Sequence, residues 1–430
     1  MAHTARGDDE EKRELFDPPD VVEEKVATLA RWISSAKHFV AFTGAGISTA
    51  AGIPDFRSGM GTVLKTGPGV WELKAKKKSR SPSRHPTVAT TKAIPTPSHM
   101  MMVKLCQEKI LKAVISQNTD GLHRRSGIAK SHLFELHGNS NLEKCSKCRR
   151  EYLRDFRTRS AGVKVHDHKT GRLCDDPKCR GTLRDSIVNF GENLPDDVLE
   201  ASSEHAEKSD LCLAMGSSLT VTPAADIPKT VGKKKIKEGG LVIVNLQVTP
   251  LDRYASLRIN AKCEDVAKLL TKKLGLTLPE FRLKRKLEIG HRLEASAGAV
   301  TFVKGLSADN RPFSYVKEVQ FELPGPTKNV VCVTKEPFEV RVRRPVATTP
   351  VAKKSSSSSS SSVQLKVVFF GHYGEPPLDF SHVLHGKESK KIVELEYNPF
   401  CQKWNDDTAA STVATEDDDL ASGMSKLAVT

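Results

Sequence analysis

Short apolar runs recur through the first two thirds of the chain and alternate with segments of helical pattern. The apolar runs are too short for helices, and each predicts a strand that is buried on both faces. They are residues 38–42, 113–116, 211–215 and 241–244, and residues 188–195 predict a further strand that runs into a turn. Helices are predicted for residues 21–35, 98–112, 197–206 and 261–274. Strands that alternate with helices predict an α/β fold with a parallel sheet.

The last third of the chain has a different pattern, in which apolar and polar side chains alternate. The alternating segments are residues 315–323, 338–342, 363–370 and 392–397. Short alternating strands separated by turn residues predict a separate β-sandwich-like domain. We therefore expect two domains, at residues 15–280 and 285–404, with a flexible polyserine loop at 355–362 inside the second. Residues 1–14 and the acidic segment 405–430 are predicted to be disordered.

The chain is basic, with 67 Lys and Arg residues against 52 Asp and Glu residues and a formal net charge of +15. This charge favours a polyanionic partner such as nucleic acid or chromatin, although a solvated surface with basic tails has the same composition. The basic run at residues 74–84 is either a nuclear import signal or nucleic-acid contact, or a solvated flexible insert. No apolar run approaches the roughly 18 residues of a membrane span. Residues 1–14, polar and on balance acidic, do not resemble a secretory signal.

Two glycines stand between the first predicted strand and a helix that is predicted to start at Thr49. Such a turn presents backbone N–H groups and a helix N-terminus to a pyrophosphate. Gly44 permits the tight turn, and Gly46 lets a ligand approach the backbone closely. A Gly-x-Gly turn is an ordinary tight turn about as often as it is a phosphate-binding turn. The prediction of a phosphate site therefore depends on the segments that follow.

Polar side chains follow the other predicted strands, at the edge where open α/β sheets bind ligands. These polar segments are residues 117–123, 216–219 and 245–247. His137 follows a further apolar stretch and is either a structural histidine or a general base, for which its ordinary pKa near 6.5 is suited. Asp55, Phe56 and Arg57 form a loop that is either a lid over a nucleotide or a surface turn with an internal ion pair. Trp71, at the start of a short predicted helix, belongs to the core or stacks on a ligand.

The nine cysteines are odd in number and unevenly spaced, which favours a reducing compartment and a metal site over a disulfide framework. Two short pairs, Cys145 with Cys148 and Cys174 with Cys179, predict a tetrahedral Zn²⁺ site in a module at about residues 140–185. Four thiolates leave no open coordination position, so the ion is expected to be structural. His166 and His168 lie between the pairs and are alternative ligands of lower rank.

Together these motifs resemble the sirtuin family, over residues 14–280. The resemblance rests on residues 44–48, 54–57, 117–120, 137–138, 190–192, 216–218, Asn245 and the four cysteines. Residues 16–19, 69–71, 122–127 and 244–247 resemble the nuclear, chromatin-associated class IV type. The likeness implies a Rossmann-like NAD domain with a small zinc module.

The resemblance also implies a site. Residues expected to bind NAD are Gly44, Ala45, Thr49, Asp55, Phe56, Arg57, Trp71, Gln117, Asp120, Gly216, Ser217, Ser218, Asn245, Gln247 and Cys263. His137 and Asn118 are the expected catalytic residues. Gln117 and Asn118 would contact the nicotinamide ribose, and Asp120 the carboxamide. The acyl oxygen of an acyl-lysine would attack the anomeric carbon and release nicotinamide, and His137 would take a proton from the ribose hydroxyl that then attacks the imidate.

The resemblance therefore implies an NAD-dependent protein-lysine deacylase of the nucleus that acts on histones and makes O-acyl-ADP-ribose. Two alternatives remain: a protein mono-ADP-ribosyltransferase and a non-catalytic, NAD-binding chromatin scaffold. An insertion at residues 60–66 departs from the family pattern and leaves the acyl preference open. The C-terminal segments 316–323, 336–340 and 366–370 resemble a YEATS-type sandwich, without an evident acyl-binding aromatic segment, so a docking or stabilising module is favoured there.

Overall fold

The computed structural model describes residues 12–76, 88–159, 164, 166–294, 298–343 and 362–405. The chain forms two compact units. Unit 1 consists of Met1–Leu283 with two short later segments, Arg311–Ser314 and Asn398–Cys401. Unit 2 consists of Lys284–Asn310, Tyr315–Tyr397 and Gln402–Thr430. Parts of the predicted terminal segments, of the basic run at 74–84 and of the polyserine loop lie outside the described residues.

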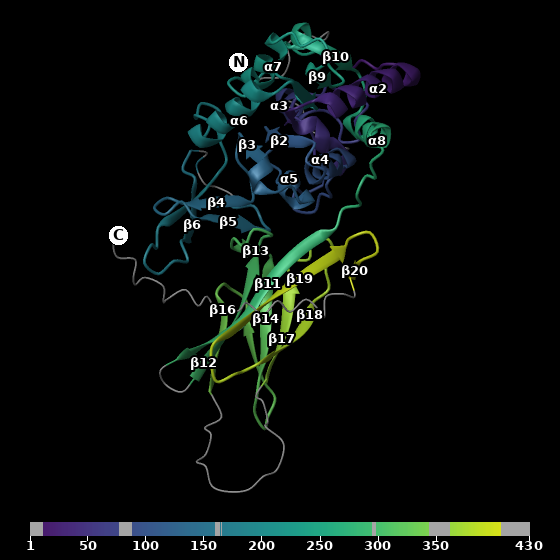
Figure 1. Cartoon of the computed structure of the whole chain (residues 1–430). Helices are drawn as coiled ribbons and strands as arrows, with labels where there is room; N and C mark the ends of the chain where they lie inside the picture. The colour runs from purple at the N-terminus through teal and green to yellow at the C-terminus, as the bar shows by residue number, and fades with distance from the viewer. Residues whose placement is uncertain are drawn as a thin grey trace, which may run out of the picture. The chain divides into compact units, whose positions relative to one another are not determined.

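Unit 1 is built on a six-stranded sheet in which every pairing is parallel (Figure 1). The strand order is β10 (Ala255–Ile259), β9 (Gly240–Val244), β8 (Leu211–Met215), β1 (Phe39–Thr43), β2 (Leu111–Ser116) and β3 (Leu133–Glu135). The chain leaves β1 toward β2 and β3 on one side and later returns to β8 on the other. The carboxyl end of β1 is therefore the point where open α/β sheets form ligand sites.

Helices cover both faces of this sheet, as the predicted α/β fold requires. Successive β1 side chains point to opposite faces, so Phe39 and Ala41 join one core while Val40 and Phe42 join the other. The first core contains α2 (Pro19–Ser35), α4 (Pro97–Gln107) and α8 (Cys263–Lys273). The second contains α6 (Asp196–Lys208) and α7 (Asp226–Lys233). Shorter helical turns are η1 (Ala45–Ala51), α3 (Val70–Lys76), α5 (Leu122–Ser126), η2 (Lys130–His132) and η3 (Asp252–Tyr254).

A small second sheet in unit 1 carries the cysteine pairs. Its order is β13 (Phe313–Ser314), β5 (Glu151–Arg154), β4 (Leu142–Cys145), β7 (Thr182–Asp185) and β6 (Lys169–Leu173). The predicted zinc module is thus an antiparallel sheet extended at one edge by a parallel strand.

Unit 2 contains two β-sheets. One has the order β16 (Phe338–Arg343), β12 (Gly298–Leu306), β11 (Leu283–Glu294), β19 (Ser389–Asn398) and β20 (Lys403–Trp404). The other has the order β15 (Asn329–Val333), β14 (Val316–Leu323), β17 (Ser362–Phe369) and β18 (Leu378–Val383). In β17 the buried side chains of Val363, Leu365, Val367 and Phe369 alternate with more exposed ones, as the sequence pattern predicted.

Three predicted elements are wrong in extent or type. The helix predicted for 98–112 ends at Gln107, because Lys109 adopts a left-handed φ of 59° and strand β2 then begins. The strand predicted for 188–195 is irregular backbone. The α-helix predicted to start at Thr49 is a 3₁₀ helix that begins at Ala45 and ends before Gly52, whose φ is 82°. Among the described residues, no helix is long and apolar enough to span a bilayer.

Candidate active site and metal centre

The carboxyl edge of the parallel sheet opens into a cavity of about 520 Å³. This volume lies within the range of roughly 300 to 1,000 Å³ that is common for small-molecule sites. The turns after β1, β2, β8 and β9 line it, together with His137 and an irregular segment at 187–194. The predicted residues that line it are Gly44, Ala45, Asp55, Phe56, Arg57, Trp71, Gln117, Asn118, His137, Gly216, Ser217, Ser218, Asn245 and Gln247.

The glycine turns after β1 and β8 pack directly against one another. The Gly46 amide donates a 2.8 Å hydrogen bond to the Gly216 carbonyl oxygen. A Cβ atom on Gly46 would lie 2.6 Å from the Gly216 Cα, and one on Gly44 would lie 2.6 Å from the Gly216 carbonyl oxygen. Both contacts are with backbone, which cannot move aside as a side chain can. The two turns thus form a cradle without side chains, which fits the close backbone approach that a pyrophosphate needs.

Side-chain amides from the end of β2 connect these turns. The Gln117 Nε2 group donates to the Ser217 Oγ atom at 2.7 Å, after β8. The Asn118 Nδ2 group donates to the Gly44 carbonyl oxygen at 3.0 Å, after β1. Asn118 is buried and Gln117 is half-buried. The structure thus brings polar residues from three strand ends into contact with one another.

His137 presents one ring nitrogen to a backbone carbonyl. Its Nδ1 atom lies 2.9 Å from the Gln117 carbonyl oxygen, and its own carbonyl accepts a 3.0 Å bond from the Val188 amide. A carbonyl only accepts hydrogen bonds, so Nδ1 carries the proton and Nε2 of the neutral ring is left as a base. Burial lowers the pKa of His137 below its usual 6.5, although the bond to Gln117 opposes this shift. The imidazole is neutral at pH 7 and suited to accept a proton.

Asp120 does not line the cavity, although the sequence predicted a contact with the nicotinamide carboxamide. Its Oδ2 atom accepts a 2.7 Å bond from the Ser48 hydroxyl, and its Oδ1 atom accepts a 2.9 Å bond from the Leu122 amide. The side chain is 8% exposed. Both carboxylate oxygens of Asp120 thus accept hydrogen bonds from protein donors. The bond from Ser48 links Asp120 to the turn after β1.

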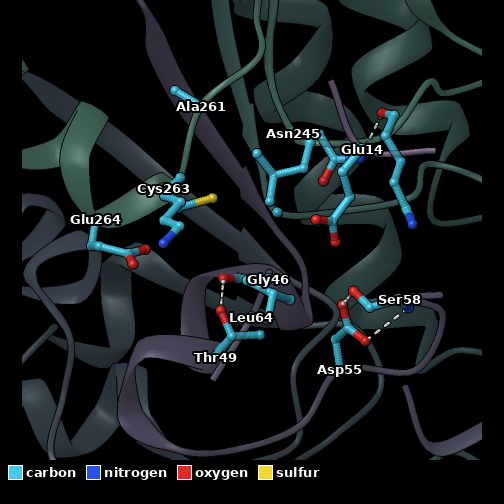
Figure 2. Close-up of a pocket in the computed structure, with 14 residues that line it drawn as sticks. Glu14, Gly46, Thr49, Asp55, Ser58, Leu64, Asn245, Ala261, Cys263 and Glu264 are labelled. Atoms are coloured by element: carbon cyan, nitrogen blue, oxygen red, sulfur yellow. Dashed lines mark hydrogen bonds between the residues drawn. The ribbon is translucent and has the colours of Figure 1, made fainter. Parts of the chain in front are cut away.

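Thr49 and Cys263 line a smaller adjoining chamber of about 40 Å³ (Figure 2). Gly46, Asp55, Gly216, Asn245 and Gln247 line both spaces, so the two lie next to each other. Burial raises the pKa of the Cys263 thiol to about 12, which keeps it protonated. Several further residues of this chamber follow no pattern that predicts a ligand site from the sequence. They are Glu14, Ser58, Leu64, Leu246, Ala261, Lys262 and Glu264.

An aromatic group borders the larger cavity. The Trp71 ring centroid lies 5.3 Å from that of Phe56 and 5.8 Å from that of Phe190, and the Arg57 guanidinium carbon lies 4.7 Å from the Trp71 ring. Phe56 and Phe190 remain about half exposed. The Asp55 carboxylate accepts bonds from the Ser58 amide at 3.0 Å and from the Ser58 hydroxyl at 2.5 Å. Of the two interpretations of this loop, the lid over a cavity fits these contacts, since Phe56 and Trp71 both face the same space.

The four predicted metal ligands come together. The sulfur atoms of Cys145, Cys148, Cys174 and Cys179 all lie within 4.8 Å of one another. The Cys145–Cys179 and Cys148–Cys174 sulfur distances are 3.5 and 3.7 Å. Tetrahedral Zn²⁺ with Zn–S bonds near 2.3 Å separates its ligands by roughly 3.8 Å, so the cluster is compatible with one structural zinc ion.

The two histidines of the same module are not part of that cluster. The His166 Nδ1 and His168 Nε2 atoms lie 2.7 and 2.9 Å from the Glu192 Oε1 atom. His168 Nδ1 also lies 3.2 Å from the Asp185 Oδ1 atom. Because His166 and Glu192 line the large cavity, these histidines connect the zinc module with the segment that carries Phe190.

The fold and site define an α/β protein with a cavity at the carboxyl edge of a parallel sheet and a four-cysteine cluster that is compatible with a structural metal ion. Comparison with known proteins identifies its family. The model of the Sir2 family matches residues 44–223. The protein named "NAD-dependent protein deacetylase SRT1" from rice, Oryza sativa subsp. indica, is 37% identical over 337 residues, which are 76% of this chain and 65% of that protein. The Drosophila melanogaster protein "NAD-dependent protein deacetylase Sirt6" is 38% identical over 273 residues, 62% of this chain and 81% of the fly protein.

A solved structure described as "Sir2-p53 peptide-NAD+" is 31% identical, with a TM-score of 0.42 over 58% of this chain and 98% of that one. The chain belongs to the Sir2 family, the sirtuins. It spans slightly less than two thirds of the length of the rice relative.

Proposed function

We propose that the chain is an NAD-dependent protein-lysine deacylase with His137 as its general base. The observation that carries the proposal is a neutral imidazole, held in one tautomer by the Gln117 carbonyl, at the wall of a cavity built on glycine turns. The rice and fly relatives are both named NAD-dependent protein deacetylases, which supports the same activity here.

The residues present fit the two groups that this activity needs. NAD would be held by the glycine cradle, by Gln117 and Asn118 and by the residues of both chambers, and when bound it supplies the ADP-ribosyl group that accepts the acyl group. Zn²⁺ would be held by the four cysteine thiolates and would stabilise the small sheet. The metal would supply no chemistry to the reaction, because all four coordination positions are taken by protein.

The chain's own groups would divide the work of catalysis. His137 would accept a proton at Nε2, and its Nδ1 bond to Gln117 would hold the ring in position throughout. Asn118 would orient the turn after β1, because its amide already bonds the Gly44 carbonyl. Phe56, Trp71 and Phe190 would exclude water from the reacting end, since their rings contact one another beside the cavity.

The substrates would be acylated lysine side chains of proteins, with histone tails as the preferred class and the nucleus as the location. The net charge of +15 supports this choice, because a basic protein is attracted to chromatin. The partly exposed aromatic rings at the cavity would allow long as well as short acyl chains to be buried.

The experiment compares purified wild-type protein, His137→Ala and the matched control His132→Ala, whose side chain lies away from the cavity and contacts Ser131. Each protein is incubated with NAD and with an acetylated or a myristoylated histone-tail peptide, and products are identified by mass spectrometry. We expect O-acyl-ADP-ribose from wild type and from His132→Ala but not from His137→Ala. A mass gain of ADP-ribose on protein without deacylation would favour a transferase. NAD binding without either product would favour a scaffold.

A further inference from the structure

The segment at residues 12–17 precedes the family-matched region and lies against the smaller chamber of the cavity. We propose that this segment, the N-terminal strap, positions the loop at residues 58–64 for dinucleotide binding, with Glu14 as the positioning residue. The proposal rests on the proposed function for the identity of the dinucleotide, NAD. It assigns a role to Glu14, which the sequence pattern predicts to lie in a disordered segment at residues 1–14.

Glu14 holds the loop with both carboxylate oxygens. Its Oε1 atom accepts a 2.5 Å hydrogen bond from the Thr62 hydroxyl, and its Oε2 atom accepts a 3.0 Å bond from the Val63 amide. Figure 2 shows this carboxylate directed into the space between Asn245 and the Asp55–Ser58 pair. Hydrogen bonds to a charged acceptor are stronger than those between neutral groups, so the two together can order a short loop.

The backbone of the strap is fixed independently of Glu14. The Leu15 amide donates to the Leu246 carbonyl oxygen at 2.7 Å. The Asp17 amide donates to the Asn260 carbonyl at 2.9 Å, and the Asp17 carboxylate accepts a 2.8 Å bond from the Asn260 amide. The same carboxylate lies 2.7 Å from Lys25 Nζ. The strap is thus anchored to the ends of β9 and β10, and the Glu14 carboxylate extends from a fixed support.

Lys12, also in the strap, contacts a second element that lines the large cavity, helix α3. Its Nζ atom lies 3.6 Å from the Oε2 atom of Glu72, a carboxylate on α3 that is only 5% exposed. The Lys12 carbonyl accepts a 3.1 Å bond from the Gln247 Nε2 group. Glu72 directly follows Trp71, so the strap touches the helix that carries Trp71 as well as Gln247, and both of those residues line the large cavity.

The strap also contacts the insertion by which this chain departs from the family pattern. Thr62 and Val63 belong to the insertion at residues 60–66, and both are bonded by Glu14. The strap and the insertion therefore stabilise each other at the chamber. Without the strap, the insertion would lose the Glu14 bonds at Thr62 and Val63, next to Leu64, which lines the chamber.

The test uses the full chain and three variants. Glu14→Ala removes both bonds to the loop, Glu14→Gln retains an acceptor for one of them, and Glu23→Ala is the matched control, since Glu23 is an exposed carboxylate on α2 that pairs with Lys273. Hydrogen exchange of the peptide that contains Val63 is measured without NAD. The dissociation constant for NAD is measured by calorimetry, and KM and kcat with an acetylated peptide.

We expect Glu14→Ala to speed exchange at Val63, to weaken NAD binding by about tenfold and to raise KM for NAD with little change in kcat. For exchange at Val63 and for NAD affinity, Glu14→Gln should lie between Glu14→Ala and wild type. Glu23→Ala should match wild type in both measurements. Unchanged exchange, or faster exchange with unchanged NAD affinity, would overturn the proposal. If wild type binds NAD but does not deacylate, and Glu14→Ala still weakens binding, the deacylase proposal fails while the role of the strap stands.

Discussion

The His137 Nδ1 atom lies 2.9 Å from the Gln117 carbonyl oxygen, and this contact decides which ring nitrogen faces the chemistry. The carbonyl has no hydrogen to donate, so the ring donates from Nδ1. Nε2 is then the only basic atom of the neutral side chain. A single backbone carbonyl at the end of β2 thus fixes both the orientation and the tautomer of the proposed base.

This contact predicts the pH dependence of catalysis. Burial lowers the pKa of His137 below 6.5, and a general base works only when it is unprotonated. Activity should therefore fall as pH decreases through the His137 pKa, and the midpoint of that acidic limb should lie below 6.5. The measurement is kcat/KM for an acetylated peptide across the range from about pH 5 to pH 8. A midpoint above 6.5 would contradict the assignment of His137 as a buried base.

Substitution of Gly46 by Ala should damage the dinucleotide site. The new Cβ would lie 2.6 Å from the Gly216 Cα, and both atoms belong to turns fixed by adjacent strands. Overpacking of this kind costs about 1–3 kcal/mol, so the two turns should separate and NAD affinity should fall by at least about tenfold. Gly386→Ala, in unit 2, is the matched control, because a Cβ there meets no atom within 4 Å. Equal NAD affinity of Gly46→Ala and wild type in calorimetry would refute the cradle.

Zinc removal should unfold the small sheet before the parallel sheet. The metal would replace the four thiol protons and hold β4 to the segment before β7, which short strands cannot do alone. We expect one zinc per chain by elemental analysis, and none in Cys145→Ser. After chelation, hydrogen exchange should accelerate in β4–β7 first and in β8 later. Cys332→Ser, an exposed cysteine of unit 2, should retain the metal and the wild-type exchange pattern.

A buried histidine pair should make unit 1 sensitive to acid. His99 and His123 have ring centroids 4.8 Å apart, and burial lowers the pKa of each to about 3. Within the described residues, no partner bonds His99 Nε2 or His123 Nδ1. Between about pH 6.5 and pH 3 the unfolded chain binds protons that the folded chain refuses, so the free energy of unfolding decreases as pH falls.

The expected slope is up to about 1.4 kcal/mol per pH unit for each histidine. Urea unfolding at several pH values, read by hydrogen exchange of β1 and β2 peptides, measures this slope for unit 1. His123→Gln should have a flatter slope than wild type, whereas His132→Gln should keep the wild-type slope. A slope that His123→Gln leaves unchanged would show that other groups dominate the acid response.

The elements that sequence patterns predicted best are those whose apolar residues are contiguous. Strand β8 has the predicted bounds, because all five of its residues are buried between helices. Strand β10 was missed because Ser256 is exposed and the strand lies at the sheet edge. Helix α7 contains Pro228 and Gly232, which disfavour a helix locally, yet Pro228 lies in the first turn, where no backbone donor is needed.

The cavity residues that the sequence pattern predicted are polar residues that directly follow a strand. A parallel sheet brings the carboxyl ends of its strands to one edge, so these residues lie close together. Gln117, Asn118 and Ser217 are of this kind. Glu14 is not, since its place at the chamber depends on backbone bonds between residues 12–17 and the distant ends of β9 and β10. Asp120 follows β2 as expected, but the strand pattern could not predict the direction of its side chain. One of its carboxylate oxygens accepts a hydrogen bond from the Ser48 hydroxyl. Long-range hydrogen bonds of this type leave no local pattern.

The packing of the Gly46 turn on the Gly216 turn has a consequence for biosynthesis. Strand β1 is made early and β8 much later, and Thr43 stands beside Met215 in the finished register. The cradle therefore does not exist on a ribosome-bound chain until the residues after β8 have emerged and paired over a long loop, which is a slow kind of contact to form. A nascent chain that ends before β8 would have no dinucleotide site. NAD would therefore stabilise only those chains in which β8 has paired with β1.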